Sequence, residues 1–400
     1  MKTKRIVLSL FAGLVVLMLG LWFSLDKDVR GVIATLPTNS DVLFWSQHQR
    51  DAGFRALDRL PVLIKARLVA AGDTGTELPP GPPIKLSSDV DAYMASQRLA
   101  GLLVVQGGKV RLERYGQKFS PSGRWTSFSV AKSVTSVLLG AAIRDGAIKS
   151  MDDMVVAYIP ELKGSSYDGV SIRQLVTMTS GVRWNEDYAD PQSDVARFNR
   201  QKPDGEFASV VSYMRRLPRV APPGIRWNYS TGDGSLLGIL ISQATGKSLS
   251  EYLSEKVWQP AGMAKPATWL LSNSGQEISG CCIQASTRDF ALFGQFVMNG
   301  AMVGGQSILP DGWLNEATTK QADIGQPGRG YGFQWWSRDD GAFEARGIFG
   351  QGIFIDPKRQ LVIASNANWA GGAVDPAASA AREAFYRAVQ AAIDTESAAR

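Results

Sequence analysis

The residues of this sequence best placed to do chemistry are Ser129 and Lys132, three positions apart in a segment that starts at Trp125. If the segment is helical, the two side chains share one face and lie within reach of each other. A serine hydroxyl is a poor nucleophile until a neighbouring base takes its proton. A lysine serves as that base only where its amine is neutral, a state that the apolar helix behind it and the helix dipole both favour. We therefore predict a nucleophilic serine with a lysine base; the alternative is a helix-capping serine beside a solvated lysine.

Two later segments can complete such a site. Tyr229 lies in a loop that enters a predicted helix, and its phenol can relay the serine proton to a leaving group if a cation lowers its pKa. The alternative is a tyrosine that packs at the helix start. Gly347, Gly350 and Gly352 accompany an apolar strand near the C-terminus. Such glycines let a substrate approach a strand whose N–H helps to form an oxyanion hole, although a β-bulge without a ligand shows the same pattern.

Residue counts exclude several other chemistries. The chain has one histidine, His48, and two adjacent cysteines, Cys281 and Cys282, which cannot supply a zinc site. No G-x-S-x-G elbow is present, and His48 lies near the N-terminal apolar run, so histidine is not the expected base. The net charge of +6 comes without a block of Lys and Arg, which gives no support to nucleic-acid binding. For the cysteines we favour two small buried side chains over a strained vicinal disulfide.

The N-terminus carries a membrane signal. Lys2, Lys4 and Arg5 precede an apolar run at 6–24, and about 19 residues suffice to cross a bilayer core. Positive charge before the run predicts a cytoplasmic N-terminus and an exported remainder. No small-x-small cleavage site follows the run, so we favour an uncleaved inner-membrane anchor over a signal peptide. The catalytic part is then expected in the periplasm or another extracytoplasmic space.

Periodicity places these residues on elements. We expect a transmembrane anchor or signal segment at 1–24, an N-terminal segment and linker at 25–85, and a serine hydrolase domain at 86–395. Gly107 and Gly108 between two apolar runs predict a β-hairpin that starts near residue 99, and apolar spacing predicts a helix from Ser129 to Asp145. Strands before and after a helix-rich stretch at about 150–285 predict one sheet with a helical insertion. The other expected elements are helices at 172–178, 207–217, 235–245 and 377–393 and strands at 331–336, 352–355 and 361–364.

The order of these motifs resembles a known group of enzymes. Ser129-x-x-Lys132, then Tyr229, then the Gly347 strand resembles the penicillin-recognising serine hydrolases over roughly residues 90 to 370. The stretch 172–181 is also typical of them. Within the group the chain is most like the class C β-lactamase-like branch, the 6-aminohexanoate-oligomer hydrolases and related esterases. The resemblance implies an α+β fold of the β-lactamase/transpeptidase type, in which helices flank an antiparallel sheet with a helical insertion domain.

The resemblance also implies roles. Ser129 matches the acylated serine, Lys132 its base and Tyr229 the group that protonates the leaving group. The backbone N–H groups of Ser129 and Ile348 would form the oxyanion hole, and Gly347 would contact the substrate. No metal and no organic cofactor is implied.

Two departures from the family pattern concern the substrate. Thr231 stands where β-lactamases have asparagine, and Ala345 stands where they have the lysine or histidine that precedes the strand glycine. Arg346 is adjacent, but strand alternation points it to the opposite face. A missing cation removes the natural partner of a substrate carboxylate, so neutral or differently charged acyl substrates fit better.

We therefore predict a serine esterase or amidase for small-molecule substrates. Trp184 and Tyr188, with Asp190, lie in a polar-aromatic loop that either lines the pocket with Thr231 or is plain surface. The alternatives are a β-lactamase or D-alanyl-D-alanine peptidase and, from another class, a non-catalytic binding relative.

Overall fold

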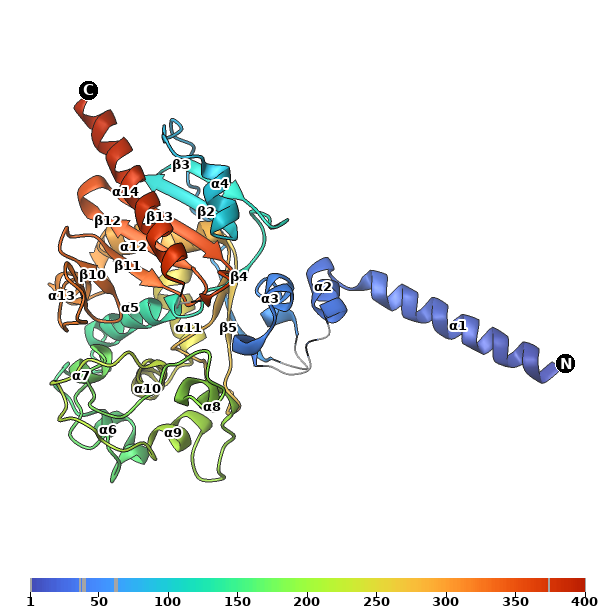
Figure 1. Ribbon diagram of the computed structural model, residues 1–400. Coiled ribbons are helices and arrows are strands. Elements are labelled where there is room, and N and C mark those ends of the chain that lie inside the picture. The colour runs from blue at the N-terminus through green and yellow to red at the C-terminus, as the bar shows by residue number, and fades with distance from the viewer. Residues whose placement is uncertain (1, 36, 38–40, 61–63, 373–374, 400) are drawn as a thin grey trace.

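A seven-stranded antiparallel sheet forms the centre of the fold, with helices on both of its faces (Figure 1). The computed structural model describes residues 2–399 apart from 36, 38–40, 61–63 and 373–374. The strand order is β3-β2-β13-β12-β11-β10-β9, and every neighbouring pair is antiparallel. The strands are β2 Leu99–Gln106, β3 Lys109–Tyr115, β9 Arg329–Tyr331, β10 Trp336–Arg338, β11 Phe343–Arg346, β12 Gly352–Asp356 and β13 Leu361–Ala367.

The predicted hairpin is confirmed as β2 and β3. Gly107 and Gly108 join them with φ of 54° and 73°. A two-residue turn with positive φ at both positions matches the twist of paired strands, and glycine adopts it without strain. On its other side β2 pairs with β13, so the first and last strands of the sheet lie side by side.

Helices on both faces leave little of the sheet exposed. Because both faces are covered, β2 is an almost continuous apolar run that is buried up to Val105. Alternate residues face different cores: Leu103 packs in the core that holds α5 and α12, and Leu102 packs in the core that holds α14. The covering helices are α4 Val90–Ser96, α5 Val130–Arg144, α12 Thr287–Met298 and α14 Pro376–Ala398.

The helix predicted to follow Ser129 is confirmed as α5. It ends at Asp145, and Gly146 follows with φ of 77°. Its residues are buried from Val130 to Ala142, since it lies between the sheet and a lobe of helices. A helix enclosed in this way buries its polar side chains as well as its apolar ones.

The helical lobe agrees in outline with the predicted insertion. The three helices predicted in it are present as α7, α9 and α10, with shorter or longer ends. Ser230 caps α10, because its hydroxyl accepts a hydrogen bond from the Asp233 N–H at 3.0 Å, and Gly246 ends that helix. The helices here are α6 Val155–Tyr158, η3 Pro160–Leu162, α7 Ile172–Val176, α8 Asp194–Arg200, α9 Ser209–Met214, α10 Thr231–Thr245, α11 Leu249–Leu253 and η4 Ser254–Trp258.

One predicted strand was wrong. Residues 331–336 are not one strand: Tyr331 ends β9, Trp336 begins β10, and residues 332–335 form the turn between them, in which Gln334 has φ of 62°. Phe333 and Trp335 alternate like strand residues, but both are buried from the turn itself. Alternating burial in a tight turn therefore imitated a strand pattern.

A second sheet was not predicted. Its strand order is β1-β5-β6-β4, and β4 leads directly to Ser129. These strands have two to four residues, too few for a period of two to stand out in the sequence. They are β1 Ala66–Val69, β4 Trp125–Thr126, β5 Ala267–Leu270 and β6 Ile283–Ala285; the remaining elements are β7 Met302–Val303, β8 Gln306–Ser307, α13 Trp313–Thr318 and η5 Pro357–Arg359.

The N-terminal segment joins an apolar helix to the folded body. Helix α1 Lys2–Ser24 projects away from the body, and its apolar part, Ile6–Ser24, is unburied and long enough to cross a membrane (Figure 1). The side chains of residues 2–5, on which the predicted orientation depends, are outside the described part. Short helices then pack against the body: α2 Lys27–Thr35, η1 Val42–Phe44, α3 Gln47–Gly53 and η2 Leu57–Arg59.

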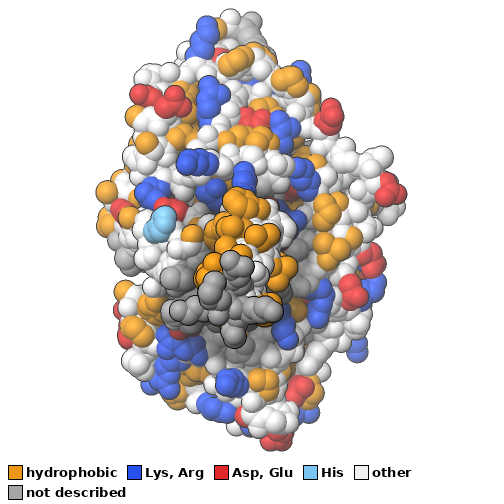
Figure 2. Space-filling view, turned by 90° about the vertical axis from the view of Figure 1, so that its right-hand side faces the viewer, with side chains coloured by type: hydrophobic (Ala, Val, Ile, Leu, Met, Phe, Trp, Pro, Cys, Tyr) orange, Lys and Arg blue, Asp and Glu red, His pale blue; other side chains and the backbone are white. Residues whose placement is uncertain are grey.

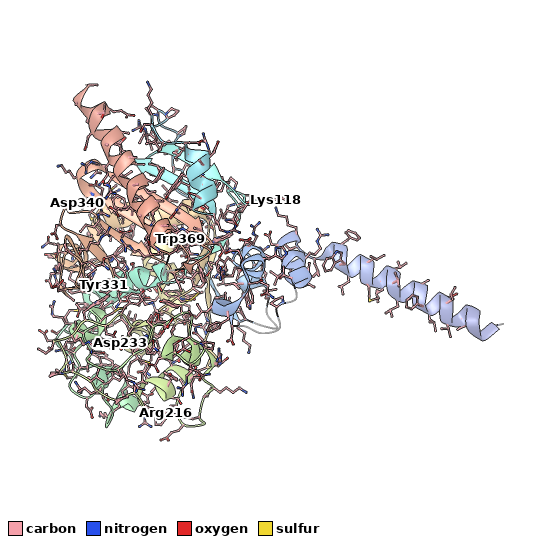
Figure 3. The ribbon with its side chains drawn as sticks, in the orientation of Figure 1. Lys118, Arg216, Asp233, Tyr331, Asp340 and Trp369 are labelled. Carbon is pink, nitrogen blue, oxygen red and sulfur yellow. A yellow bond between two sulfur atoms is a disulfide. The ribbon has the colours of Figure 1, made fainter. Side chains whose placement is uncertain are left out.

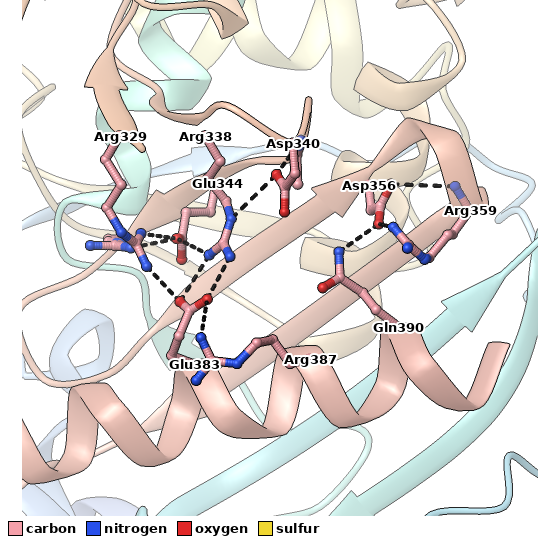
Figure 4. Close-up of polar contacts among 11 residues, drawn as sticks. Arg329, Arg338, Asp340, Glu344, Asp356, Arg359, Glu383, Arg387 and Gln390 are labelled. Atoms are coloured by element: carbon pink, nitrogen blue, oxygen red, sulfur yellow. Dashed lines mark hydrogen bonds and ion pairs between the residues drawn. The ribbon is translucent and has the colours of Figure 1, made fainter. Parts of the chain in front are cut away.

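An ionic network joins β9, β10 and β11 to α14 (Figure 4). Glu344 is fully buried and pairs with Arg329, Arg338 and Arg346. Glu383 on α14 pairs with Arg329 at 2.6 Å and also with Arg338. Burial raises the pKa of Glu344, but Arg346 and the other guanidinium groups outweigh it and lower the pKa to about 2.

We predict that Glu344→Gln destabilises the protein by about 3 kcal/mol at neutral pH, because it leaves several partly buried guanidinium groups without this carboxylate. Since the folded-state pKa lies below the unfolded value of 4.5, the contribution is present above that pH and disappears as pH falls toward 2. Urea unfolding at pH 7 and pH 3 measures both. Arg387→Ala is the control: its side chain is 64% exposed and pairs with Glu383 at 3.6 Å, so we expect a change below about 0.5 kcal/mol. Equal losses in the two variants would contradict the assignment.

Candidate active site

A strained turn places Ser129 at the start of α5. Phe128 has φ of 44°, a conformation that a bulky residue adopts only when its surroundings hold it there. Its ring packs edge-on against Phe54 at 4.9 Å and Phe349 at 5.0 Å, one from the N-terminal segment and one from the link between β11 and β12. Aromatic packing on both sides therefore fixes the backbone that presents the serine hydroxyl.

Lys132 is the centre of the polar contacts. Its Nζ lies 3.0 Å from Ser129 Oγ, 3.0 Å from Thr231 Oγ1 and 2.7 Å from the Gly280 carbonyl oxygen. The side chain is 1% exposed. Burial lowers the pKa of the Lys132 amine to about 8, although Glu186 opposes part of that fall. A substantial share of the amine is therefore neutral near physiological pH, beside a serine hydroxyl.

Tyr229 closes the third side of this arrangement. Its hydroxyl hydrogen-bonds to Ser129, and the Lys132 Nζ lies 4.9 Å from the centre of its ring. The condition set for a proton relay, a cation that lowers the pKa of this phenol, is not met. Burial and then Glu186 raise the pKa of Tyr229 far above its usual value, so the phenol keeps its proton. Trp336 stacks on the ring at 5.5 Å and holds its orientation.

Sequence reasoning missed Glu186. Its carboxylate accepts hydrogen bonds from the Thr231 N–H at 2.9 Å, the Thr231 hydroxyl, the Tyr188 hydroxyl at 2.5 Å and the Trp184 indole N–H. Thr231 therefore lies between Lys132 and this carboxylate, accepting from one and donating to the other. The only signal in the sequence is the position of the glutamate between the two aromatic residues that were named as candidates.

The other predicted residues take two kinds of position. Thr231, Tyr188 and Ile348 line a cavity of about 290 Å³ that contains Ser129. Trp184 does not line it; its ring is buried in the helical lobe, and it reaches the site only through Glu186. Gly347 lies behind the cavity, where a Cβ would come within 2.7 Å of the Ser127 carbonyl oxygen, so this position has no room for a side chain.

Two backbone N–H groups are free for an oxyanion. Within the described residues, neither the Ser129 N–H nor the Ile348 N–H donates a hydrogen bond to the protein. Both residues line the cavity. Buried N–H groups are normally paired, so two unpaired donors at one cavity suit a ligand oxygen.

The site lies at the junction of the sheet and the helical lobe. Figure 3 shows Tyr331, from β9, on the sheet side and Asp233, from α10, in the lobe. Helix α10 approaches α5 closely because residue 234 is glycine: a Cβ there would lie 3.1 Å from Lys132 Cε. The lysine thus fills space that a side chain on α10 would occupy.

Comparison with known proteins places the chain in a family. A family model described as Beta-lactamase matches residues 86–387, which is more than half of the 400-residue chain. The chain belongs to the beta-lactamase family. It is a serine hydrolase of esterase or amidase type, as the motifs predicted.

Individual proteins that are similar to this chain support the assignment. The 6-aminohexanoate-dimer hydrolase of Paenarthrobacter ureafaciens is 28% identical over 336 residues, which cover 78% of this chain and 85% of the relative. A beta-lactamase of Pseudomonas fluorescens is 26% identical over 190 residues, covering 44% of this chain and 48% of the relative. A solved structure from Bacillus anthracis, provisionally described as a 6-aminohexanoate-dimer hydrolase, has a TM-score of 0.77 and 23% identity, covering 87% of this chain and 95% of its own. That likeness confirms the predicted fold class.

One expectation about this beta-lactamase family member needs correction. We favoured separate side chains for Cys281 and Cys282, but they form a vicinal disulfide. The chain turns here, where the Cys281 N–H donates to the Ile278 carbonyl at 2.9 Å, and the turn brings the neighbouring sulfur atoms together. Both cysteines line the cavity, directly after the Gly280 carbonyl that accepts from Lys132.

The contacts of Glu186 predict a pH effect. Because this carboxylate raises the pKa of the Lys132 amine, Glu186→Gln is expected to lower it. The midpoint of the rise in Ser129 acylation with pH then moves to lower pH, which the rate of fluorophosphonate labelling measures. Asp187→Asn removes the same charge from an exposed neighbour in the same loop and is the control. A midpoint that is unchanged in Glu186→Gln, or that moves equally in both variants, would refute the coupling.

Proposed function

We propose that this enzyme cleaves ester or amide bonds of small molecules through an acyl-enzyme on Ser129. The observation that carries the proposal is the buried Lys132 amine, which lies within hydrogen-bond distance of the Ser129 hydroxyl and has a pKa of about 8. A serine beside a neutral amine has the base that its nucleophilic attack requires.

In the first half-reaction, Lys132 Nζ takes the Ser129 proton while Oγ attacks the substrate carbonyl carbon. The carbonyl oxygen gains negative charge between the N–H groups of Ser129 and Ile348, whose free hydrogens suit that role. The bond to the leaving group then breaks. Tyr229 donates its proton to the departing oxygen or nitrogen, and the proton held by Lys132 restores the phenol.

In the second half-reaction, water attacks the acyl-enzyme carbonyl and gives its proton to Lys132. The bond between Ser129 Oγ and the acyl carbon breaks, and the proton returns to the serine. The products are an acid and an alcohol or amine, and the enzyme returns to its starting state. Since Thr231 connects Lys132 to Glu186, the carboxylate stabilises the transient ammonium without direct contact.

The substrate we propose has a neutral acyl group. Ala345, at the position where related β-lactamases have a cation, is fully buried, and Arg346 pairs with Glu344 instead of pointing at the cavity. A carboxylate at this end of the substrate would lack its usual partner. The relative from Paenarthrobacter ureafaciens, a hydrolase of a 6-aminohexanoate dimer by name, also supports an acyl substrate outside the β-lactams.

We also propose that α1 remains as a membrane anchor and that the catalytic part is exported. The apolar stretch Ile6–Ser24 has a mean hydropathy of 2.6 and no buried residues. A helix of this length and composition suits a bilayer core.

The decisive experiment compares two substrates with the full-length enzyme in detergent. We expect turnover of p-nitrophenyl butyrate and no turnover of a chromogenic cephalosporin. Ser129→Ala should lower ester turnover at least about 1,000-fold and abolish fluorophosphonate labelling. Cephalosporin turnover that depends on Ser129 would favour a β-lactamase, and the absence of both turnover and labelling would favour a non-catalytic relative.

A second prediction concerns the proton transfers. Tyr229→Phe should lower kcat for an alkyl ester such as ethyl butyrate by about 100-fold or more, with little change in KM, because an alkoxide leaving group needs the proton that a general acid supplies in the transition state. Tyr331→Phe is the control, since Tyr331 packs on Tyr229 but is not proposed to move a proton.

In the wild type, kcat/KM should rise with pH around pH 8 as Lys132 loses its proton. A profile that stays flat over about one to two pH units on either side of pH 8 would contradict a lysine base.

A further inference from the structure

We propose that the substrate is an amphiphile of the bilayer surface, whose apolar acyl chain lies in the cavity beside Ser129. This inference rests on the proposed function and adds the substrate class. The observation that supports it is that residues 42–57, the segment that follows the anchor and that we call the anchor-proximal segment, supply part of the cavity wall.

That wall comes from residues far from Ser129 in the sequence. Val42, Leu43 and Phe44 of η1 and Leu57 of η2 line the cavity together with Ser129. Leu270, at the end of β5, also lines the cavity and packs in the same hydrophobic cluster as Leu57. An aliphatic chain would therefore contact these apolar side chains once its carbonyl reaches the serine.

The same segment is fixed to the end of the anchor. Asp26 follows the apolar stretch after one residue, and it pairs with Arg59 of η2 at 2.7 Å. Arg59 also pairs with Asp28 at 3.0 Å. Since Leu57 and Arg59 belong to one short helix, the chain that leaves the membrane and the cavity wall are joined within a few residues. Only one residue therefore separates the apolar stretch from a residue that pairs with the helix supplying part of the cavity wall.

The helical lobe holds the other end of this wall. Arg200 of α8 pairs with Asp41 at 2.9 Å, and its guanidinium lies 5.6 Å from the centre of the Phe44 ring. Asp41 and Phe44 both line the cavity. Arg200 therefore contacts both the residue before η1 and the last residue of η1, which holds this short helix at the cavity.

Charge on this face suits a membrane surface. Figure 2 views the side from which α1 projects, and Lys and Arg side chains surround the base of the anchor there. Near Arg200, the side chains of Arg197, Lys202 and Arg216 line one depression. Cations at the base of the anchor can bind the phosphate groups of lipid headgroups, which favours an orientation with the anchor-proximal wall toward the bilayer.

The test uses the full-length enzyme in vesicles of phosphatidylcholine and phosphatidylglycerol. With p-nitrophenyl esters from acetate to decanoate, we expect kcat/KM to rise about fourfold per added methylene until the cavity is full. Phe44→Ser should lower kcat/KM for the octanoate ester about tenfold and for the acetate ester less than about twofold. Phe44→Leu, which keeps an apolar side chain, should restore most of the octanoate activity.

Ile225→Ser is the matched control, because Ile225 is an apolar residue of the helical lobe that is 76% exposed. It should leave the chain-length profile unchanged.

Delivery from the membrane is tested with p-nitrophenyl palmitate placed either in the enzyme's own vesicles or in separate ones, and we expect faster turnover in the shared vesicles.

A flat chain-length profile, or equal turnover from shared and separate vesicles, would overturn the inference. Acetate turnover that still depends on Ser129 would leave the proposed function intact in that case. If the wild-type enzyme does not hydrolyse the acetate ester at all, the proposed function itself is contradicted.

Discussion

The buried amine of Lys132 is the constraint on which the site depends. An ammonium group is costly to bury unless a carboxylate pairs with it, and here the nearest carboxylate, Glu186, is reached only through the Thr231 hydroxyl. This arrangement keeps the amine close to neutrality without leaving it unsatisfied. It also explains features at some distance: α5 must be enclosed on all sides, α10 must carry glycine at position 234, and the Gly280 carbonyl must point inward.

Trp336 connects the ionic network on one face of the sheet with the catalytic tyrosine on the other. On the α14 face, Glu344 holds Arg346 away from the cavity. The same guanidinium lies 5.2 Å from the ring centre of Trp336, and Trp336 stacks on Tyr229. A network that contributes to stability therefore also positions the ring of the phenol. Because the arginine is committed to this network, the position of Ala345 is left without a cation toward the substrate.

The sequence was most informative where chemistry follows from local spacing. Ser129 and Lys132 share one helical turn, so their meeting needs no knowledge of the fold, whereas Tyr229 and Ile348 were found only through the order of motifs. Glu186 was missed because its partners depend on a loop that has no periodicity. The aromatic packing of Phe54 behind the serine was missed for a similar reason, since contacts between distant loops leave no pattern in either segment. Short strands such as those of the second sheet are lost in the same way.

The pairing of β2 with β13 has a consequence for biosynthesis. Strand β2, near position 100, pairs with β13, near position 360, so the central sheet cannot form completely until β13 has been synthesised. Pairings between such distant segments form late in folding. The Ile348 N–H, in the link between β11 and β12, arrives only shortly before that last strand. A growing chain therefore already contains its serine and lysine but not the second oxyanion donor. The complete oxyanion hole therefore requires a chain that extends at least to residue 348.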